Sequence, residues 1–206
     1  MLASALGACS AAAPRPGAAP VAGTEAPVVV PGAPGGEGRV ATPGERVGEP
    51  DSVTSAADVM FAERMIPHHR QALEMAALAA DRTTSPAVTA LAERITSGQG
   101  PEIAVMSRWL TAQGRQVPAD HGHEPDQAYG MASLAEMNRL RAARGKEFDT
   151  LLLRLMIRHH EGAVRMAGEE LAGGGDQLML KMAGDVVSGQ RAEIVRMRRL
   201  LDGTPS

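Results

Sequence analysis

The chain contains the stretch Met65-Ile66-Pro67-His68-His69-Arg70-Gln71-Ala72-Leu73-Glu74-Met75-Ala76 and repeats it 91 residues later as Met156-Ile157-Arg158-His159-His160-Glu161-Gly162-Ala163-Val164-Arg165-Met166-Ala167. At this offset, Asp58–Leu110 and Asp149–Leu201 align without a gap and share 17 identical residues in 53 positions. Chance would give roughly three or four identities at ordinary composition. The similarity indicates an internal duplication, so the two copies are expected to share one structure.

Each copy is predicted to form a helical hairpin. In the first copy, Met65, His68, Ala72 and Met75 recur at steps of three and four residues. This spacing places them along one face of a helix. A polar stretch with a proline at its end, Asp81–Pro86, is expected to separate this helix from the next one.

The expected ends of the helices are marked by residues that favour caps. Ser85 is a suitable N-cap and Pro86 a suitable first helical residue for the second helix of the first copy. In the second copy, Gly173–Gly175 is expected to end one helix and Asp176 to cap the next. Between the copies, the apolar spacing over Met131–Leu140 predicts a short additional helix.

The predicted fold is an all-α four-helix bundle over residues 55–202, made of two duplicated hairpins (58–110 and 149–201) related by a pseudo-twofold axis. A lone hairpin cannot bury its apolar face, so the two hairpins are expected to pack together. No segment alternates with period two, as a half-buried strand would. Aromatic residues make up only 2% of the chain, so the core must consist of aliphatic side chains and methionine.

The chain before the bundle is rich in alanine, proline and glycine, and residues 10–54 are predicted to form a disordered tether. Leu6-Gly7-Ala8-Cys9 resembles the cleavage signal of bacterial lipoproteins, so residues 1–9 are interpreted as a partial signal with Cys9 as the lipid anchor. The charged region and most of the apolar region of such a signal are missing, so the start codon is expected upstream, or the sequence is clipped. The alternative is an incidental apolar start. The lipoprotein interpretation predicts an extracytoplasmic protein that meets the membrane only through this anchor.

Composition excludes several classes of function. A single cysteine allows neither a disulfide framework nor a cysteine metal site. A net charge of −3 and so few aromatic residues argue against binding to nucleic acid. No nucleophile–base pair or polarised carboxylate pair occurs at a recognisable spacing, so the protein is not expected to be an enzyme.

The duplicated histidines and methionines predict a paired metal site. Imidazole and thioether both ligate metals, and thioether selects soft ions, so copper is expected, with Cu(I) favoured over Cu(II). Di-iron bundles carry a glutamate three residues before each histidine, where this chain has Met65 and Met156. The candidate ligands are His68, His69, Met65, Met75, His159, His160, Met156 and Met166. Six further residues are candidates as additional ligands, as hydrogen-bond acceptors for the imidazole N–H groups, or as packing and capping residues: Gln99, Glu102, Met106, Gln190, Glu193 and Met197.

Other interpretations of these residues stay open. A methionine stripe at helical spacing is often core, and a lone buried histidine is often only hydrogen-bonded. Burying four imidazoles without partners is costly, however, which favours metal binding for the pairs. His121 and His123 belong to a polar segment between the copies and are interpreted as linker residues, with an exposed Cu(II) site as the alternative. The two half-sites can share one ion or hold one each.

Two signatures resemble a known family. Asp58-Val59-Met60-Phe61 followed by Met65-Ile66-Pro67-His68-His69, and Gly130-Met131 through Met156-Ile157-Arg158-His159-His160-Glu161-Gly162-Ala163, are similar to the signatures of the bacterial DUF305 family. The resemblance covers about residues 55–202. It implies a ferritin-like bundle and an exported protein that binds copper through the histidines and methionines at the matching positions.

The leading hypothesis is therefore a copper-binding protein that sequesters copper outside the cytoplasm or passes it to a metal-transfer protein. The first alternative is a redox enzyme that turns over at the same centre. The second is a helical interaction module in which the histidines are structural.

Overall fold

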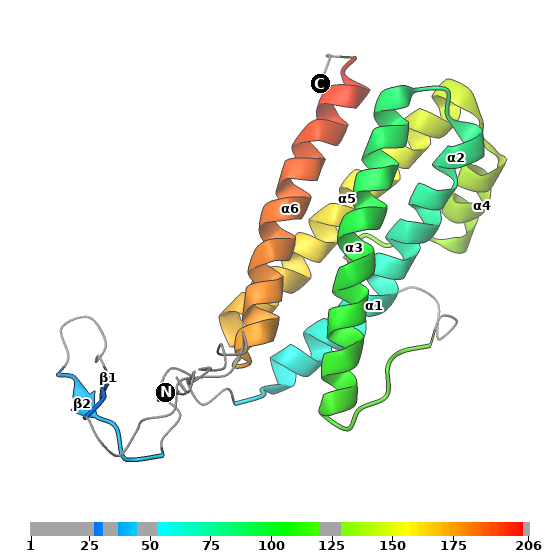
Figure 1. The fold of residues 1–206 in the computed structure, drawn as a ribbon. Coiled ribbons are helices and arrows are strands. Elements are labelled where there is room, and N and C mark those ends of the chain that lie inside the picture. The colour runs from blue at the N-terminus through cyan, green and yellow to red at the C-terminus, as the bar shows by residue number, and fades with distance from the viewer. Residues whose placement is uncertain (1–26, 31–36, 45–52, 120–128, 204–206) are drawn as a thin grey trace, which may run out of the picture. The chain divides into compact units, whose positions relative to one another are not determined.

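The computed structural model describes residues 27–30, 37–44, 53–119 and 129–203 (Figure 1). The chain divides into two compact units, residues 1–52 and 53–206. Cys9 and the rest of the expected lipoprotein signal lie outside the described residues, as do His121 and His123. In the described part of the chain, no helix combines the length and the apolar character needed to span a membrane.

The first unit contains a short antiparallel pair of strands, β1 (Val29–Val30) and β2 (Arg39–Val40). Val29 pairs with Val40, and the Ala41 amide donates to the Val28 carbonyl at 2.8 Å. The sequence predicted a disordered tether without strands here, and the structure differs at these residues. The physical reason is local: β-branched valines favour the extended backbone even within a segment rich in proline and glycine.

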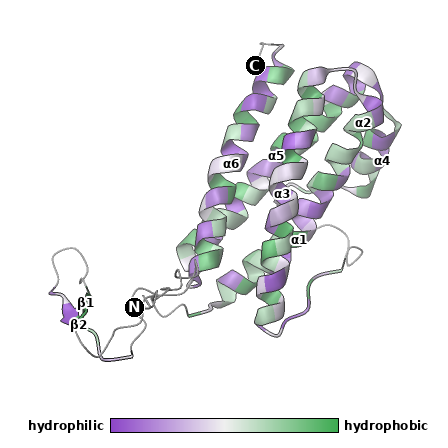
Figure 2. Ribbon diagram, in the orientation of Figure 1, coloured by the Kyte–Doolittle hydropathy of each residue, from purple (hydrophilic) through white to green (hydrophobic). Residues whose placement is uncertain are grey.

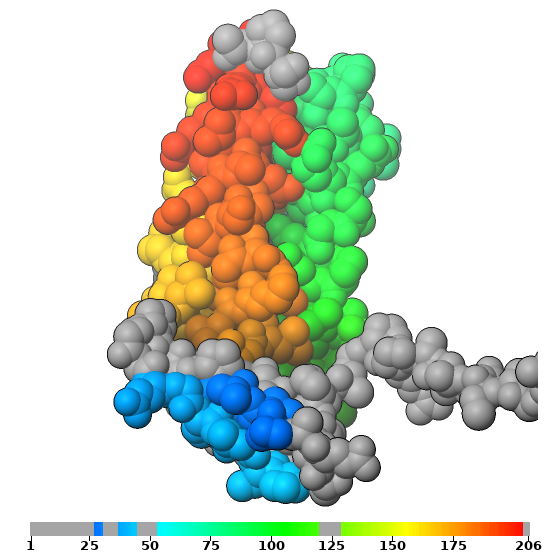
Figure 3. Space-filling model, turned by 60° about the vertical axis from the view of Figure 1, so that its left-hand side comes forward, coloured from blue at the N-terminus to red at the C-terminus, as the bar shows by residue number. Residues whose placement is uncertain are grey.

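The second unit is the predicted all-α bundle. Its helices are α1 (Ala56–Ala77), α2 (Ala79–Arg82), α3 (Pro86–Ala112), α4 (Leu134–Ala142), α5 (Gly145–Gly173) and α6 (Gln177–Leu201). The hairpins α1–α3 and α5–α6 pack against each other mainly through α1 and α5, which run antiparallel (Figure 1). On another face, α3 and α6 lie side by side (Figure 3). Four long helices and two duplicated hairpins confirm the predicted fold class.

Side chains at the predicted positions cap the helices. The Ser85 hydroxyl accepts from the Val88 amide, with Pro86 as the first residue of α3. The Asp176 carboxylate accepts from the amides of Leu178 and Met179 at 2.9 and 3.1 Å and begins α6. The short additional helix predicted over Met131–Leu140 is α4, which begins three residues later than expected at a Ser133–Glu136 capping box.

Apolar side chains of the bundle form two interior clusters, and hydrophilic residues alternate with them along each helix (Figure 2). The first cluster contains Phe148, Leu152 and Met156 of α5 with the buried residues of α4. The second contains Phe61 and Met65 of α1. The duplication thus produces two related half-cores, one on either side of the middle of the bundle.

A buried carboxyl pair ties the start of α1 to the turn between α5 and α6. The Asp58 carboxylate accepts from the amides of Ser55, Gly175 and Asp176 at 2.5–3.2 Å. Burial raises the pKa of Asp58, but hydrogen bonds from Glu170 and from these amides outweigh it and hold the pKa below its ordinary value. Burial and the neighbouring Asp58 raise the pKa of Glu170 from 4.5 to about 8. Glu170 is therefore protonated, and so uncharged, at neutral pH.

The Glu170→Gln variant is expected to gain stability over the wild type as the pH rises. A carboxyl whose pKa is raised on folding stabilises the protein below its unfolded pKa of 4.5 and loses that contribution as the pH approaches about 8. Glutamine has nearly the same size and does not ionise. Urea unfolding between pH 5 and about 8.5 should show a growing difference in the free energy of unfolding. Glu93→Gln, at an exposed position of α3, is the control and should show no such trend; a flat difference for Glu170→Gln would contradict the assignment.

Candidate metal centre

The four duplicated histidines lie together in the middle of the bundle, where α1 crosses α5. All four are at most 1% exposed. The rings of His68 and His159 stack across the pseudo-twofold axis, with centroids 3.6 Å apart and planes inclined by 30°. The His159 and His160 ring centroids are 6.4 Å apart. The duplication therefore brings imidazoles from both copies into one buried layer.

The outer histidine of each copy is held by a glutamate of its own hairpin. His69 Nε2 lies 2.6 Å from Glu102 Oε2, and His160 Nε2 lies 2.7 Å from Glu193 Oε2. Each carboxylate accepts a hydrogen bond from Nε2–H, which fixes the tautomer and leaves the lone pair on Nδ1. Within the described residues, neither Nδ1 atom has a hydrogen-bond partner. Nδ1 is thus the ring atom that remains for a ligand.

The two inner histidines differ from each other. His68 Nε2 donates to the Tyr129 carbonyl at 3.1 Å, whereas neither ring nitrogen of His159 has a partner in the described part of the chain. Burial lowers the pKa of His68 to about 3 and lowers that of His159 well below its ordinary value. Both rings are therefore neutral at physiological pH, which is the form that ligates metals.

The strap, Tyr129–Ser133, contacts the inner histidine His68 through the Tyr129 carbonyl and was not anticipated from the sequence. Its backbone approaches α5 so closely that a Cβ on Gly162 would lie 1.5 Å from the Tyr129 carbonyl oxygen. A Cβ on Gly130, whose φ is +73°, would lie 2.2 Å from the Arg158 carbonyl oxygen. Only glycine fits at these two positions.

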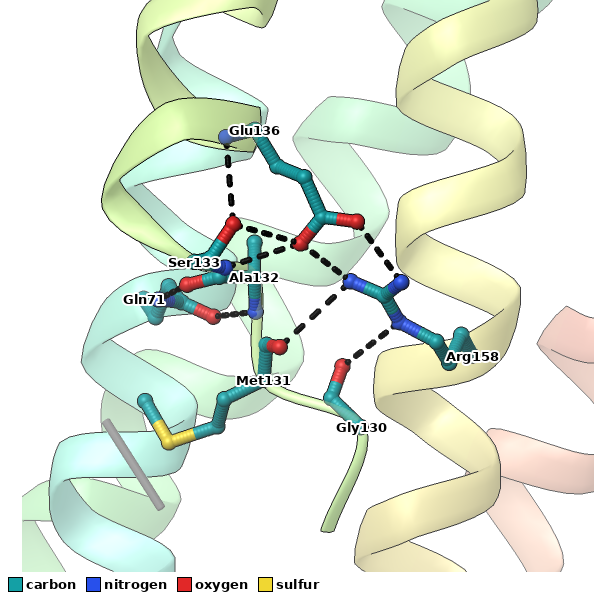
Figure 4. A network of polar contacts seen from close by, with 7 residues as sticks. All are labelled: Gln71, Gly130, Met131, Ala132, Ser133, Glu136 and Arg158. Atoms are coloured by element: carbon teal, nitrogen blue, oxygen red, sulfur yellow. Dashed lines mark hydrogen bonds and ion pairs between the residues drawn. The ribbon is translucent and has the colours of Figure 1, made fainter. Parts of the chain in front are cut away.

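Side chains from both copies fasten the strap (Figure 4). On the α1 side, the Gln71 amide donates to the Ala132 carbonyl at 2.8 Å and accepts from the Ala132 amide at 2.7 Å. On the α5 side, Arg158 forms a bidentate pair with Glu136, with both N···O distances 2.7 Å, and also donates to the carbonyls of Gly130 and Met131. Arg158 and the Ser133 cap lower the pKa of Glu136 to about 2. Gln71 and Gly162 occupy equivalent positions of the repeat, so each copy meets the strap differently.

The candidate methionines are buried in two sets that the pseudo-twofold axis exchanges. Met65, Met106 and Met166 belong to one apolar cluster, and Met75, Met156 and Met197 belong to the other. Along α1, Met65 precedes and Met75 follows the histidines, so the sets lie on opposite sides of the histidine layer. Each set combines thioethers from both copies.

The remaining candidates are Gln99 and Gln190, which are buried and whose amide groups have no hydrogen-bond partner within the described ranges. Among those residues, no three histidine, cysteine, aspartate or glutamate side chains are grouped to hold a metal ion. A metal in this layer would therefore need thioether or amide donors beside the imidazoles. Unpartnered imidazole nitrogens, neutral inner rings and buried thioethers in the adjoining apolar clusters are donors that suit a soft ion.

The residues 58–201 match the model of one protein family, described as a domain of unknown function, DUF305. No curated protein matches the chain.

Several solved structures are similar. A DUF305 fragment from Deinococcus radiodurans is 32% identical with a TM-score of 0.67, covering 73% of this chain and 98% of that one. A DUF305 protein from Streptomyces coelicolor, described as secreted, is 33% identical with a TM-score of 0.66, covering 71% and 91%. CopM in its Cu(II)-bound form is 32% identical with a TM-score of 0.63, covering 71% and 96%; it has also been solved with Cu(I) and with silver.

Proposed function

This chain belongs to the DUF305 family, and on that premise we propose that it binds copper ions outside the cytoplasm, to sequester them or to pass them to a metal-transfer protein. The relative described as secreted supports the extracytoplasmic location. We further propose that Cys9 attaches the protein to the membrane through a lipid. We propose binding without turnover, because the described residues of the candidate site offer metal ligands and include no nucleophile–base pair.

The observation that carries the proposal is the state of His159. Its ring is 1% exposed and stacked on His68, yet within the described residues neither of its nitrogens is hydrogen-bonded. A buried unpartnered imidazole costs about 1–3 kcal/mol. A site that binds a cation gives a physical reason to retain such a residue, whereas a purely structural role does not.

Soft donors favour Cu(I) as the cargo. His69 and His160 would bind through Nδ1, because Glu102 and Glu193 hold Nε2. The methionine sets would supply the thioethers, one on each side of the histidine layer. CopM, about a third identical, was solved with Cu(I), Cu(II) and silver, which supports copper over harder metals.

A titration of the full chain tests the proposal. Cu(I) is added under anaerobic conditions in competition with a chromogenic chelator, and Ag(I) serves as a redox-inert probe. The expected result is a dissociation constant well below about 1 μM, without steady oxygen consumption by the loaded protein. Binding no tighter than micromolar would end the proposal, and sustained turnover with oxygen would replace it with the redox enzyme.

A further inference from the structure

The second apolar cluster reaches the surface at one small pocket between α1 and α5. It is lined by Ala57, Met60, Phe61, Arg64, Met166, Glu169 and Glu170. The Met60 side chain is 46% exposed, whereas Met166 is buried in the same cluster as Met65 and Met106. Thioethers therefore run from a half-exposed position into one of the two methionine sets.

The equivalent place in the other copy is lined by apolar residues alone. Shifting each lining residue by the 91-residue offset of the repeat gives only apolar residues: Phe148, Leu151, Leu152, Leu155, Met75, Leu78 and Ala79. All seven belong to the first apolar cluster or pack against it, together with Met137 and Leu140 of α4. Here Met60 becomes Leu151, and the two charged wall residues Arg64 and Glu169 become leucines. The symmetry of the bundle is thus broken at this pocket.

We propose that this pocket is the port through which soft monovalent metal ions enter the bundle, with Met60 as the first thioether that captures them. The inference rests on the proposed function and adds a residue and a route to it. The port passes an ion from Met60 to Met166 and then to the buried set around Met65 and Met106. The other copy has Leu151 in place of Met60 and so lacks a thioether there.

The polar side of the pocket is connected to the strap. The Tyr129 hydroxyl donates to Glu169 at 2.7 Å and accepts from Arg64 at 3.3 Å, and the Tyr129 carbonyl accepts from His68. The Arg64 guanidinium carbon also lies over the Tyr129 ring, 5.8 Å from the ring centroid. Arg64 and Glu169 are both exposed and carry opposite charges, so the thioether of Met60, rather than a net negative charge, is the feature of the entrance that selects a soft ion.

The rate of metal uptake tests the port. Trp109 is the only tryptophan of the chain and is buried in the same cluster as Met106 and Met166. Its quenching by Ag(I) can be followed by stopped flow in the full chain. Met60→Leu, which keeps the size of the side chain and is well tolerated, is expected to slow uptake on the order of tenfold while the final stoichiometry stays unchanged.

The matched control is Leu178→Met, which adds a thioether at a position of α6 that is 46% exposed, as Met60 is, and does not line the pocket. It should leave the rate unchanged. Uptake by Met60→Leu at the wild-type rate would overturn the port while leaving metal binding intact. If Met60→Leu bound one Ag(I) ion fewer than the wild type but at the same rate, Met60 would be a storage ligand, and the port would also be overturned. Failure of the wild type to take up Ag(I) would overturn the proposed function itself.

Discussion

Replacing His159 with leucine is expected to remove high-affinity Cu(I) binding and, at the same time, to stabilise the metal-free protein. The ring is buried, neutral and without a hydrogen-bond partner among the described residues. Leucine has a similar volume and no polar atoms, so the variant is expected to gain about 1–3 kcal/mol in the free energy of unfolding. Removing a residue that only hydrogen-bonds a metal ligand lowers metal affinity by up to about 100-fold. Removing the ligand itself should therefore lower the Cu(I) affinity by at least that much.

The matched control for this prediction is His68→Leu. His68 is the equivalent residue of the first copy, but it donates to the Tyr129 carbonyl at 3.1 Å. Its replacement leaves that carbonyl unpaired, so the stability gain should be smaller or absent, although metal affinity falls as well. Urea unfolding of the metal-free proteins and competition titration with Cu(I) measure the two effects. If His159→Leu destabilises the protein and keeps its metal affinity, the histidine is structural, as the interaction-module alternative holds.

Gly162→Ala is expected to destabilise the protein, although alanine normally favours a helix by about 1 kcal/mol over glycine. The new Cβ would lie 1.5 Å from the Tyr129 carbonyl oxygen and 2.3 Å from its carbon, so backbone must move on one side. Overpacking of this kind costs about 1–3 kcal/mol or more. Displacement of the strap should also weaken the hydrogen bond from His68, which NMR of the imidazole protons can detect.

Gly168→Ala provides the control in the same helix. Gly168 is exposed, and no described atom lies within 4 Å of a Cβ built there. That variant is expected to be stabilised by about 0.5–1 kcal/mol through the backbone alone. Opposite signs for the two substitutions in urea unfolding would establish the close approach at Gly162, and equal signs would contradict it.

Local signals and the duplication were enough to predict most of the fold. Ser85 and Asp176 cap helices at the expected residues because capping depends on neighbours in the chain. The meeting of His68 and His159 follows from the pseudo-twofold packing of two equal hairpins. The split of the methionines into two sets was not predicted, because it depends on the antiparallel crossing of α1 and α5.

The role of the strap could not be predicted from the sequence either. Its contact with His68 is a backbone carbonyl, and every residue has one, so no residue type marks it. Gly162 offered the only signal, as a glycine beside the histidine pair where the first copy has Gln71. The port at Met60 had a similar signal, since methionine and leucine stand at equivalent positions. In both cases the informative feature was a difference between the copies.

The Gln71 and Gly162 contacts bear on how such a molecule can evolve. In a symmetric dimer of one hairpin, the surroundings of the two paired histidine rings would be identical. A single strap contacts the two hairpins through different residues and so cannot match that symmetry. In the single chain, positions 71 and 162 face different parts of the strap, so one requires a side-chain amide and the other a glycine. A chain rebuilt from two identical hairpins would therefore have either two glutamines or two glycines facing the strap. In both cases one of the two present contacts would be lost, and the strap would be held less firmly.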